Sequence, residues 1–437
     1  NEMGVPSLSF LQSYAGIQRL AERISAIQLA DADKKPVEYK RLQTGEYLAE
    51  HRFAWFRYVV DLKQSANAFS YAHASWLKAD GGMLALDDLL PQPTNKLRVR
   101  LTLELPRGWQ FISNEDRPGE DVLKVSDAQR AVVFVGKQWR VQPIAGTTSK
   151  MILGGDLQVG DAAISEDAAA VYKEYVRLFG SAAVGVQPQI AIIRLPSMMA
   201  GTWEAETRGS TVTIVTSGGL SPSDAEQRLD KQLRHELFHL WLPNGVNLAG
   251  NYDWFYEGFA VYEEQKLGVA MNQIRFEDFL GTLGRAYDID RWTNPQRSLI
   301  EVSQDRWSGA SGQVYARGML VAFLCDVGLL DSSKGKRSVE TLLRQIFDEH
   351  KAASAAVSGN DAIIALLRSQ PEIASIVDDY VSGSRAIDWA PILKPAGIQA
   401  TARDQLTQLS VAVKLNGRQK TLLDKLGYNN WRKLAPK

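Results

Sequence analysis

The sequence predicts an α+β protein of more than one domain, with a strand-rich N-terminal part followed by a mostly helical part. Its 437 residues are typical of about two to four domains and allow a large core. Strand patterns dominate from residue 50 to residue 160, with no strong helical pattern among them. Amphipathic helical patterns follow. We expect a β-rich domain over residues 1–160, a second domain over 161–384 and a C-terminal extension over 385–437.

The clearest strand pattern lies at residues 97–105. Leucine and valine alternate there with polar residues, so the apolar side chains share one face. Further strands are expected at residues 122–125, 131–135 and 151–153. Strands at this spacing predict a β-sandwich or a saddle-shaped sheet.

Composition excludes several classes of function. The formal net charge is zero, with 50 basic and 50 acidic residues, which is not the pattern of a nucleic-acid-binding protein. No run of eighteen apolar residues exists, so no transmembrane helix is expected. The single cysteine, Cys325, cannot form an internal disulfide. It lies in an apolar helical run, which favours a buried core thiol over a nucleophile.

The start of the chain bears on its location. It begins Asn1-Glu2-Met3, without an initiator methionine or an apolar signal region. This start fits either a mature form after signal removal or a trimmed chain, and the sequence does not separate the two. We expect a periplasmic or secreted location rather than a cytoplasmic one.

The strongest chemical signal is the segment His235-Glu236-Leu237-Phe238-His239. Two histidines four residues apart share one helix face, and two neutral imidazoles there can bind one Zn²⁺. Glu236 lies between them and can take a proton from water that the metal activates. In a chain with five histidines, a chance match is expected in about a few per thousand sequences. The alternative is a surface helix with two exposed histidines.

The surrounding residues indicate a packed helix. Ser221 is suited to the N-cap and Pro222 to the first helical position, and Pro243 marks the expected end. Leucines recur on one face, at Leu229, Leu233, Leu237 and Leu240. Such a stripe faces a core.

A third metal ligand is expected on the next helical segment, at Glu257. Seventeen residues, proline and glycines among them, separate it from His239. That gap allows a chain reversal, so a second helix can return with Glu257 in its first turn, facing the metal. Glu264 lies two turns further on the same face, where it can accept the outer N–H of a ligand histidine. Taken alone, Glu257 is equally a solvated helix carboxylate.

Together the two segments resemble the gluzincin metallopeptidases. That family has His-Glu-x-x-His on one helix and Trp-x-x-Glu-Gly-Phe-Ala on the next, as at Trp254 to Ala260 here. The aminopeptidase N family has a gap one residue longer, and the shorter gap favours a glycyl-aminopeptidase-like or divergent relative. The resemblance implies that His235, His239 and Glu257 bind one zinc ion, that Glu236 is the general base, and that Glu264 orients a ligand. It also implies a β-rich domain before a thermolysin-like catalytic domain with a mostly helical second lobe.

The resemblance implies a substrate-binding role for Glu204. The segment Gly201-Thr202-Trp203-Glu204-Ala205 is similar to the family's Gly-x-x-Glu motif, 31 residues before His235. The family carboxylate binds the free α-amino group of the substrate. Ala205 departs from the family's Asn or His, and Glu206 competes for the role. The alternative is an exposed loop glutamate.

The resemblance further implies that Tyr315 stabilises the oxyanion of the reaction. Tyr315-Ala316-Arg317-Gly318 resembles the family's Tyr-x-Lys-Gly segment, 58 residues after Glu257. The alternative is a tyrosine half-buried in the core.

These features predict a zinc metallopeptidase, expected to be an aminopeptidase with a peptide substrate and no nucleic-acid partner. Two alternatives stay open. One is an endopeptidase with the same zinc site, from which Glu204 alone distinguishes the aminopeptidase. The other is a non-catalytic peptide-binding relative, which would not need the full set of site residues.

Overall fold

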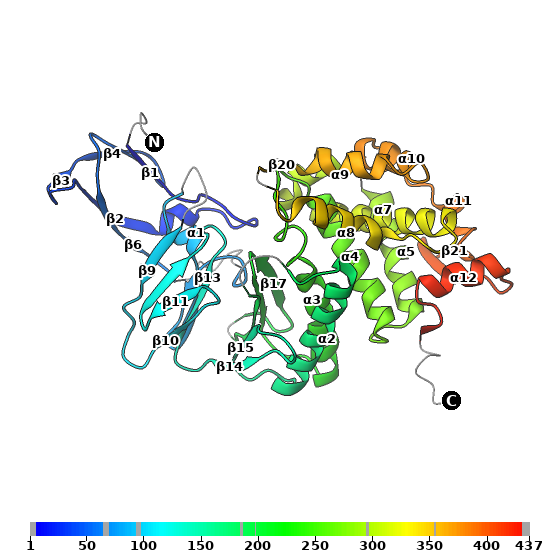
Figure 1. Ribbon diagram of the computed structural model, residues 1–437, viewed down its shortest axis with the longest axis horizontal. Coiled ribbons are helices and arrows are strands. Elements are labelled where there is room, and N and C mark those ends of the chain that lie inside the picture. Colours follow the sequence, from blue (N-terminus) through cyan, green and yellow to red (C-terminus); the bar gives the residue numbers. More distant parts are fainter. Residues whose placement is uncertain are drawn as a thin grey trace. The chain divides into compact units, whose positions relative to one another are not determined.

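Short strands fill the first part of the chain and long helices most of the rest, so the predicted α+β class is confirmed (Figure 1). The computed structural model describes residues 6–63, 70–92, 98–183, 187–196, 198–293, 297–353 and 355–430. By their contacts the residues form two units, each made of two stretches of sequence. Unit 1 comprises Asn1–Glu166 and Gly185–Pro222, and unit 2 comprises Asp167–Val184 and Ser223–Lys437.

Unit 1 begins with four small sheets and two short helices. Their strands in sheet order are β1 (Ser7–Ser9), β5 (Glu46–Ala49) and β4 (Tyr39–Gln43); β3 (Pro36–Val37), β2 (Ile24–Ala30) and β6 (Trp55–Val60); β10 (Gln110–Ile112), β13 (Val132–Gly136), β8 (Gly81–Ala85) and β7 (Trp76–Leu77); β11 (Asp116–Gly119), β12 (Val122–Val125) and β9 (Val99–Thr102). The helices are η1 (Leu20–Arg23) and α1 (Leu86–Leu89). The strand expected at 97–105 is therefore only four residues long where the structure describes it. The predicted alternation of apolar and polar residues is confirmed, because Leu101, Leu103 and Leu105 pack against one hydrophobic cluster.

A five-stranded sheet completes unit 1. Its order is β14 (Arg140–Pro143), β15 (Lys150–Gly154), β16 (Gln189–Arg194), β18 (Thr211–Thr216) and β17 (Trp203–Arg208). The central strands β15, β16 and β18 are parallel, and their residues are almost all buried. Strand β17 pairs antiparallel with β18 at one edge. The segment 201–205, read as a possible loop, thus enters an edge strand that carries Glu204.

Unit 2 is mostly helical. Helix α2 (Asp161–Phe179) begins in unit 1 and continues into unit 2. The following helices are α3 (Pro222–Phe238), α4 (Asp253–Ala270), α5 (Phe276–Trp292), α6 (Leu299–Gln304), η2 (Arg306–Ser308), α7 (Ser311–Ser332), α8 (Val339–His350), α9 (Gly359–Arg368), α10 (Ala374–Val377), η3 (Asp378–Ser382), α11 (Ala390–Leu393) and α12 (Gly417–Lys425). Two strand pairs join them, β19 (Leu248–Ala249) with β20 (Val357–Ser358), and β21 (Ile398–Arg403) with β22 (Leu406–Val411).

Helix α3 follows the predicted stripe but ends earlier than predicted. Leu229, Leu233, Leu237 and Leu240 are all buried. The α-helix stops at Phe238 instead of continuing to Pro243, and His239 donates its backbone N–H to Glu236 in a tighter turn. A residue that precedes proline avoids the helical conformation, so the chain leaves the helix before Leu242-Pro243, which is a cis peptide.

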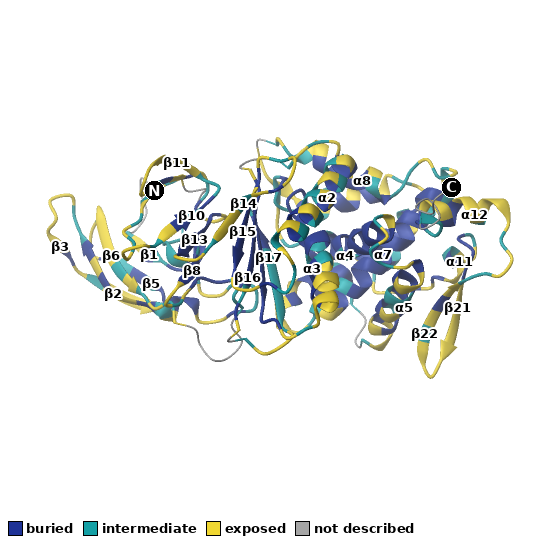
Figure 2. Cartoon of the chain, turned by 90° about the horizontal axis from the view of Figure 1, so that it is seen from below, coloured by how far each residue is buried: buried dark blue, intermediate teal, exposed yellow. Residues whose placement is uncertain are grey.

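Helices α4 and α7 form the core of unit 2, where Figure 2 draws them mostly in dark blue. Helix α7 is long and apolar enough to cross a membrane, but 89% of its most apolar window is buried inside the protein, as in a core helix. Cys325 lies on it and is fully buried, which confirms the predicted core thiol.

Two glycines let α4 and α7 cross closely. A Cβ added to Gly258 would lie 2.4 Å from the Cα of Gly318, and one added to Gly318 would lie 2.6 Å from the carbonyl oxygen of Trp254. No side chain fits in that space. Gly258, which follows Glu257, and Gly318, three residues after Tyr315, therefore allow the two helices to approach closely.

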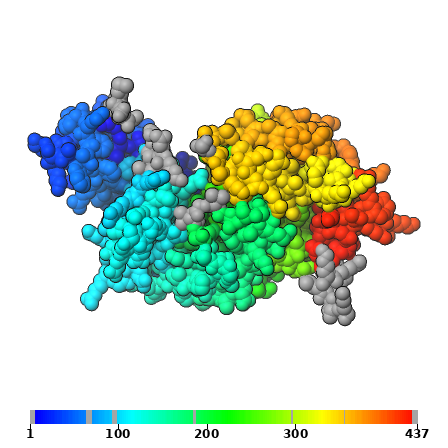
Figure 3. All heavy atoms as spheres, in the orientation of Figure 1, coloured from blue at the N-terminus to red at the C-terminus, as the bar shows by residue number. Residues whose placement is uncertain are grey.

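The C-terminal extension packs on the helices of unit 2. The backbone N–H of Thr407 in β22 donates to Asp288 of α5, and Arg418 of α12 pairs with Asp331 of α7. The red C-terminal residues cover the end of unit 2 in Figure 3.

Candidate zinc site

Three side chains from α3, the turn after it, and α4 converge in unit 2. The Nε2 atoms of His235 and His239 lie 3.2 Å apart. The Oε2 atom of Glu257 lies 3.3 Å from the Nε2 of His235 and 3.7 Å from that of His239. The sequence predicted these three donors, and the structure brings them together. Helix α4 begins at Asp253, so Glu257 is its fifth residue and lies just beyond the predicted first turn.

The Nδ1 atom of each imidazole contacts a neighbouring oxygen, and this orients Nε2 towards the other two donor atoms. The Nδ1 of His239 lies 2.9 Å from the carbonyl oxygen of Leu242. The Nδ1 of His235 lies 3.5 Å from the Oε2 of Glu264. Ligand histidines in metal sites commonly use the second nitrogen in this manner. Glu264 is buried and is brought next to His235, where the sequence predicted it.

The three donors fit zinc. Donor atoms of a tetrahedral zinc site lie about 3.4 Å apart, because zinc–ligand bonds measure about 2.0–2.1 Å. The Oε2 of Glu257 is buried and accepts no hydrogen bond from any residue that the structure describes. A buried carboxylate oxygen without a partner is costly unless a cation satisfies it. Two imidazole nitrogens and one carboxylate oxygen are the donor set of many catalytic zinc sites.

The electrostatics of the site favour a cation. Although burial acts to raise it, the charges of Arg306 and His239 hold the pKa of Glu257 well below its ordinary value. Burial lowers the pKa of His235, but Glu257 and Glu264 outweigh it and raise that pKa to about 10. The carboxylates that stabilise a proton on His235 also favour a bound metal ion.

Glu236 and Tyr315 lie close to these donors. Glu236 is buried on α3, and its charge contributes to raising the pKa of both His235 and Tyr315. The ring of Tyr315, on α7, lies 6.4 Å from that of His235. Burial holds the pKa of Tyr315 well above its ordinary value, so its hydroxyl is a neutral donor.

Sequence reasoning missed Arg306. This residue starts η2 and is 8% exposed. Its Nη2 lies 2.8 Å from the Oε1 of Glu257 and donates to the Tyr315 hydroxyl at 2.7 Å. No spacing rule marks an arginine that reaches both residues from a connecting turn, because only the tertiary fold brings it there.

Glu204 lies in unit 1, on β17. Its Oε2 accepts hydrogen bonds from the Ser70 hydroxyl at 2.9 Å and from the Tyr71 backbone N–H at 2.6 Å. It is partly buried in a strand, so the alternative of an exposed loop glutamate is wrong.

Glu206, the competing carboxylate, is more fully engaged. It accepts a hydrogen bond from the Tyr14 hydroxyl at 2.6 Å and lies 2.9 Å from the Nε2 of His73. Burial acts to raise its pKa, but His73 and Arg208 outweigh burial and lower it to about 2. His73 therefore serves an ordinary polar pairing with Glu206.

Comparisons with known proteins bear on the fold. No protein-family model matches the sequence, and no curated protein matches it. Among solved structures, an aminopeptidase N family protein from Idiomarina loihiensis is 16% identical, with a TM-score of 0.77 over 95% of this chain and 78% of that one. An M1 zinc metallopeptidase from Deinococcus radiodurans, bound to a Tyr-Ser-Ala substrate in mutant form, is 17% identical, with a TM-score of 0.56 over 87% of each chain.

Leukotriene A4 hydrolase from Saccharomyces cerevisiae is 13% identical, with a TM-score of 0.55 over 95% of this chain and 64% of that one. At such identities the likeness is one of fold. This chain has the fold of the gluzincin zinc metallopeptidases that its two motifs resemble.

Proposed function

We propose that this chain is a zinc-dependent metallopeptidase that removes N-terminal residues from peptides, with residues 161–384 as its peptidase domain. The observation that carries the proposal is the convergence of His235, His239 and Glu257 on one point, with Glu257 Oε2 buried and accepting no hydrogen bond from the described residues. The fold likeness to M1 metallopeptidases supports it.

The side chains around this point suit peptide hydrolysis. When bound, zinc supplies Lewis-acid chemistry, acidifying water and polarising a carbonyl. Glu236 removes a proton from the attacking water as its oxygen bonds to the scissile carbonyl carbon. Glu236 then delivers that proton to the amide nitrogen as the C–N bond breaks, which releases a free amine and a carboxylic acid that ionises to the carboxylate.

Two further residues complete the proposed chemistry. The neutral hydroxyl of Tyr315 donates a hydrogen bond to the oxyanion that develops on the carbonyl oxygen. Glu204 binds the free α-amino group of the substrate, by its resemblance to the family's amine-binding glutamate. One oxygen of Glu204 accepts two hydrogen bonds in unit 1, which fixes the orientation of the carboxylate.

Metal analysis with a substrate panel tests the proposal. The purified protein should hold one zinc ion per chain and hydrolyse peptides with a free N-terminus faster than the same peptides N-acetylated. His235→Ala should lose both metal and activity, whereas His350→Ala, in the same unit but outside the donor set, should keep both. A wild-type protein that neither holds nor takes up zinc would contradict the proposal.

The main alternative is an endopeptidase with the same zinc site. It predicts equal cleavage of free and acetylated peptides, so the same panel separates the two activities.

A further inference from the structure

Arg306 joins the third metal donor to the proposed oxyanion donor. Its Nη2 lies 2.8 Å from the Oε1 of Glu257, the oxygen that does not face the histidines. The same nitrogen donates to the Tyr315 hydroxyl at 2.7 Å. One guanidinium therefore contacts residues of two helices, α4 and α7, at the centre of the site.

Arg306 is itself held in place. Its Nη1 lies 3.1 Å from the Oδ2 of Asp253, whose Oδ1 accepts a hydrogen bond from the Tyr256 hydroxyl at 2.6 Å. On another side, the guanidinium carbon lies 4.4 Å from the centre of the Trp307 ring. A planar guanidinium that forms an ion pair with a carboxylate and stacks on an aromatic ring has little rotational freedom.

We propose that Arg306 is a positioning residue of this site, which fixes Glu257 as a single-oxygen metal ligand and holds the Tyr315 hydroxyl in its working position. This inference rests on the proposed function. With Oε1 bound to Arg306, only Oε2 of Glu257 is directed at the two histidine nitrogens. A carboxylate that binds through one oxygen leaves more of the metal's coordination sphere for water and substrate.

The arginine cannot be replaced by a simple positive charge in this role. The guanidinium contacts Glu257 and Tyr315 through Nη2 and Asp253 through Nη1. Its planar arrangement of several N–H donors allows these contacts to form at the same time. The ammonium of a lysine would keep the charge but not the geometry. Charge and geometry can therefore be separated by two substitutions.

The experiment compares Arg306→Gln and Arg306→Lys with wild type after loading with Co²⁺, whose visible absorption reports coordination geometry. Arg291→Gln is the control, because Arg291 is a partly exposed arginine of unit 2 that pairs with Asp288 away from the site. We expect Arg306→Gln to alter the cobalt spectrum, as Glu257 becomes free to bind through both oxygens. With zinc, its kcat should fall roughly 10- to 100-fold with little change in KM.

Arg306→Lys should give an intermediate spectrum and an intermediate kcat. Because it keeps the buried positive charge, it also provides the test if Arg306→Gln does not fold. A purely structural arginine would lower the melting temperature and leave both the cobalt spectrum and the kcat of the folded enzyme unchanged. That outcome in either folded variant overturns the inference while the proposed function stands. A wild-type protein that binds neither cobalt nor zinc overturns both.

Discussion

Each proposed metal donor has its other polar atom held by a neighbouring group. His239 uses Nδ1 on the Leu242 carbonyl, His235 uses Nδ1 on Glu264, and Glu257 uses Oε1 on Arg306. The three remaining donor atoms are left facing one another. Side chains held by such contacts lose little freedom when a metal binds, which favours affinity and fixes geometry.

Glu236 can be tested without disturbing the donors. Glu236→Gln should retain one zinc per chain and near-normal KM, while kcat falls roughly 10²- to 10⁴-fold, because only the proton acceptor is lost. Metal analysis and steady-state kinetics measure this. Glu226→Gln, an exposed position on the same helix, should behave as wild type. Near-normal kcat in Glu236→Gln would mean that another group takes the proton.

Tyr315 separates a chemical role from a packing role. Tyr315→Phe keeps the ring but removes the hydroxyl, so kcat should fall about 100-fold or more with little change in KM, as for loss of one oxyanion donor. The melting temperature should change little. Tyr287→Phe, at a half-buried tyrosine stacked on Trp389, is the matched control. A lower melting temperature with normal kcat would support the core-tyrosine alternative.

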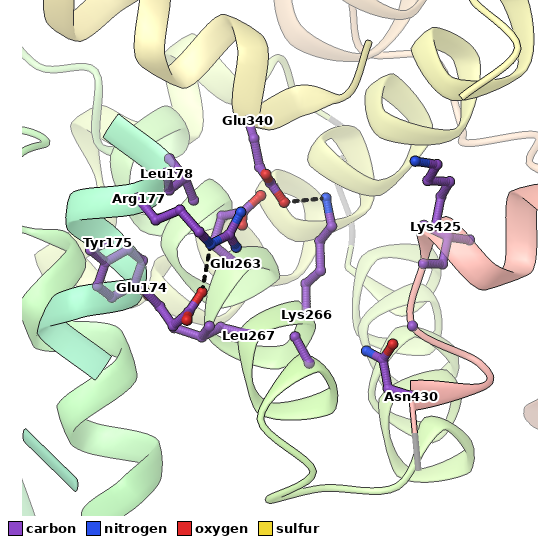
Figure 4. Close-up of a pocket in the computed structure, with 13 residues that line it drawn as sticks. Glu174, Tyr175, Arg177, Leu178, Glu263, Lys266, Leu267, Glu340, Lys425 and Asn430 are labelled. Atoms are coloured by element: carbon purple, nitrogen blue, oxygen red, sulfur yellow. Dashed lines mark hydrogen bonds and ion pairs between the residues drawn. The ribbon is translucent and has the colours of Figure 1, made fainter. Parts of the chain in front are cut away.

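At the scale of elements, helix α4 carries different chemistry on its two sides. Glu257 and Glu264 serve the donor cluster, whereas Glu263 and Lys266 face a cavity of about 180 Å³ (Figure 4). Lys266 pairs there with Glu340 at 2.9 Å and with Asp326 of α7 at 3.0 Å. These ion pairs connect α4 to α7 and α8 behind the site.

Glu263 makes the stability of unit 2 depend on pH. Burial raises its pKa from the ordinary 4.5 to about 8, although Lys266 opposes the shift, and its Oε1 has no hydrogen-bond partner among the described residues. The folded protein thus favours the neutral carboxyl. The unfolded chain ionises first as pH rises, so this contribution to stability is complete below about pH 4.5 and is lost by about pH 8.

Glu263→Gln should therefore flatten the pH dependence. Its melting temperature should be close to wild type near pH 5 and a few degrees higher near pH 9, because the amide cannot ionise. Melting curves over pH 5–9 measure the difference. Glu349→Gln, exposed on α8, should follow the wild-type curve throughout. A gap between Glu263→Gln and wild type that is constant with pH would contradict the assignment.

In the whole molecule, the contacts that the sequence predicts are those between residues close in the chain or within recognisable motifs. His235 and His239 share a turn, and Glu257 and Tyr315 sit in short motifs, so the sequence predicted all four near one another. Arg306 was not predicted, since it lies 49 positions after Glu257 in the chain and reaches it from the turn η2. The hydrogen bond between Glu206 and Tyr14 was not predicted either, because residues so distant in sequence meet only in the folded unit 1.

Removing the metal should affect one unit. The proposed ligands all lie in unit 2 and link α3 to α4, so zinc binding should stabilise that unit. A free zinc concentration of about 1,000 times Kd would add about 4 kcal/mol to the free energy of unfolding. Chelation should increase hydrogen exchange in peptides covering residues 229–264. Peptides covering β8 and β13 of unit 1 serve as the internal control and should change little. Equal deprotection of both units, or none, would contradict a zinc site confined to unit 2.

We expect the preference of the whole molecule for peptides with a free N-terminus to depend on Glu204. Pairing a substrate ammonium with a carboxylate is worth about 2–4 kcal/mol as a truncation cost, so Glu204→Ala should lower kcat/KM for free-amine peptides by roughly one to three orders of magnitude. An N-acetylated peptide has no charge to pair and should be cleaved slowly by both proteins. Paired assays of the same peptide in free and acetylated form measure this.

Glu206→Gln is the control for the proposed role of Glu204. Glu206 is tied to Tyr14 and His73, so its loss should lower the stability of unit 1 more than it alters substrate preference. A selective loss of free-amine activity at Glu206, with none at Glu204, would move the amine anchor two residues along β17. If Glu204→Ala harms free and acetylated substrates equally, Glu204 is not the amine anchor. The endopeptidase alternative then becomes the better account of the site.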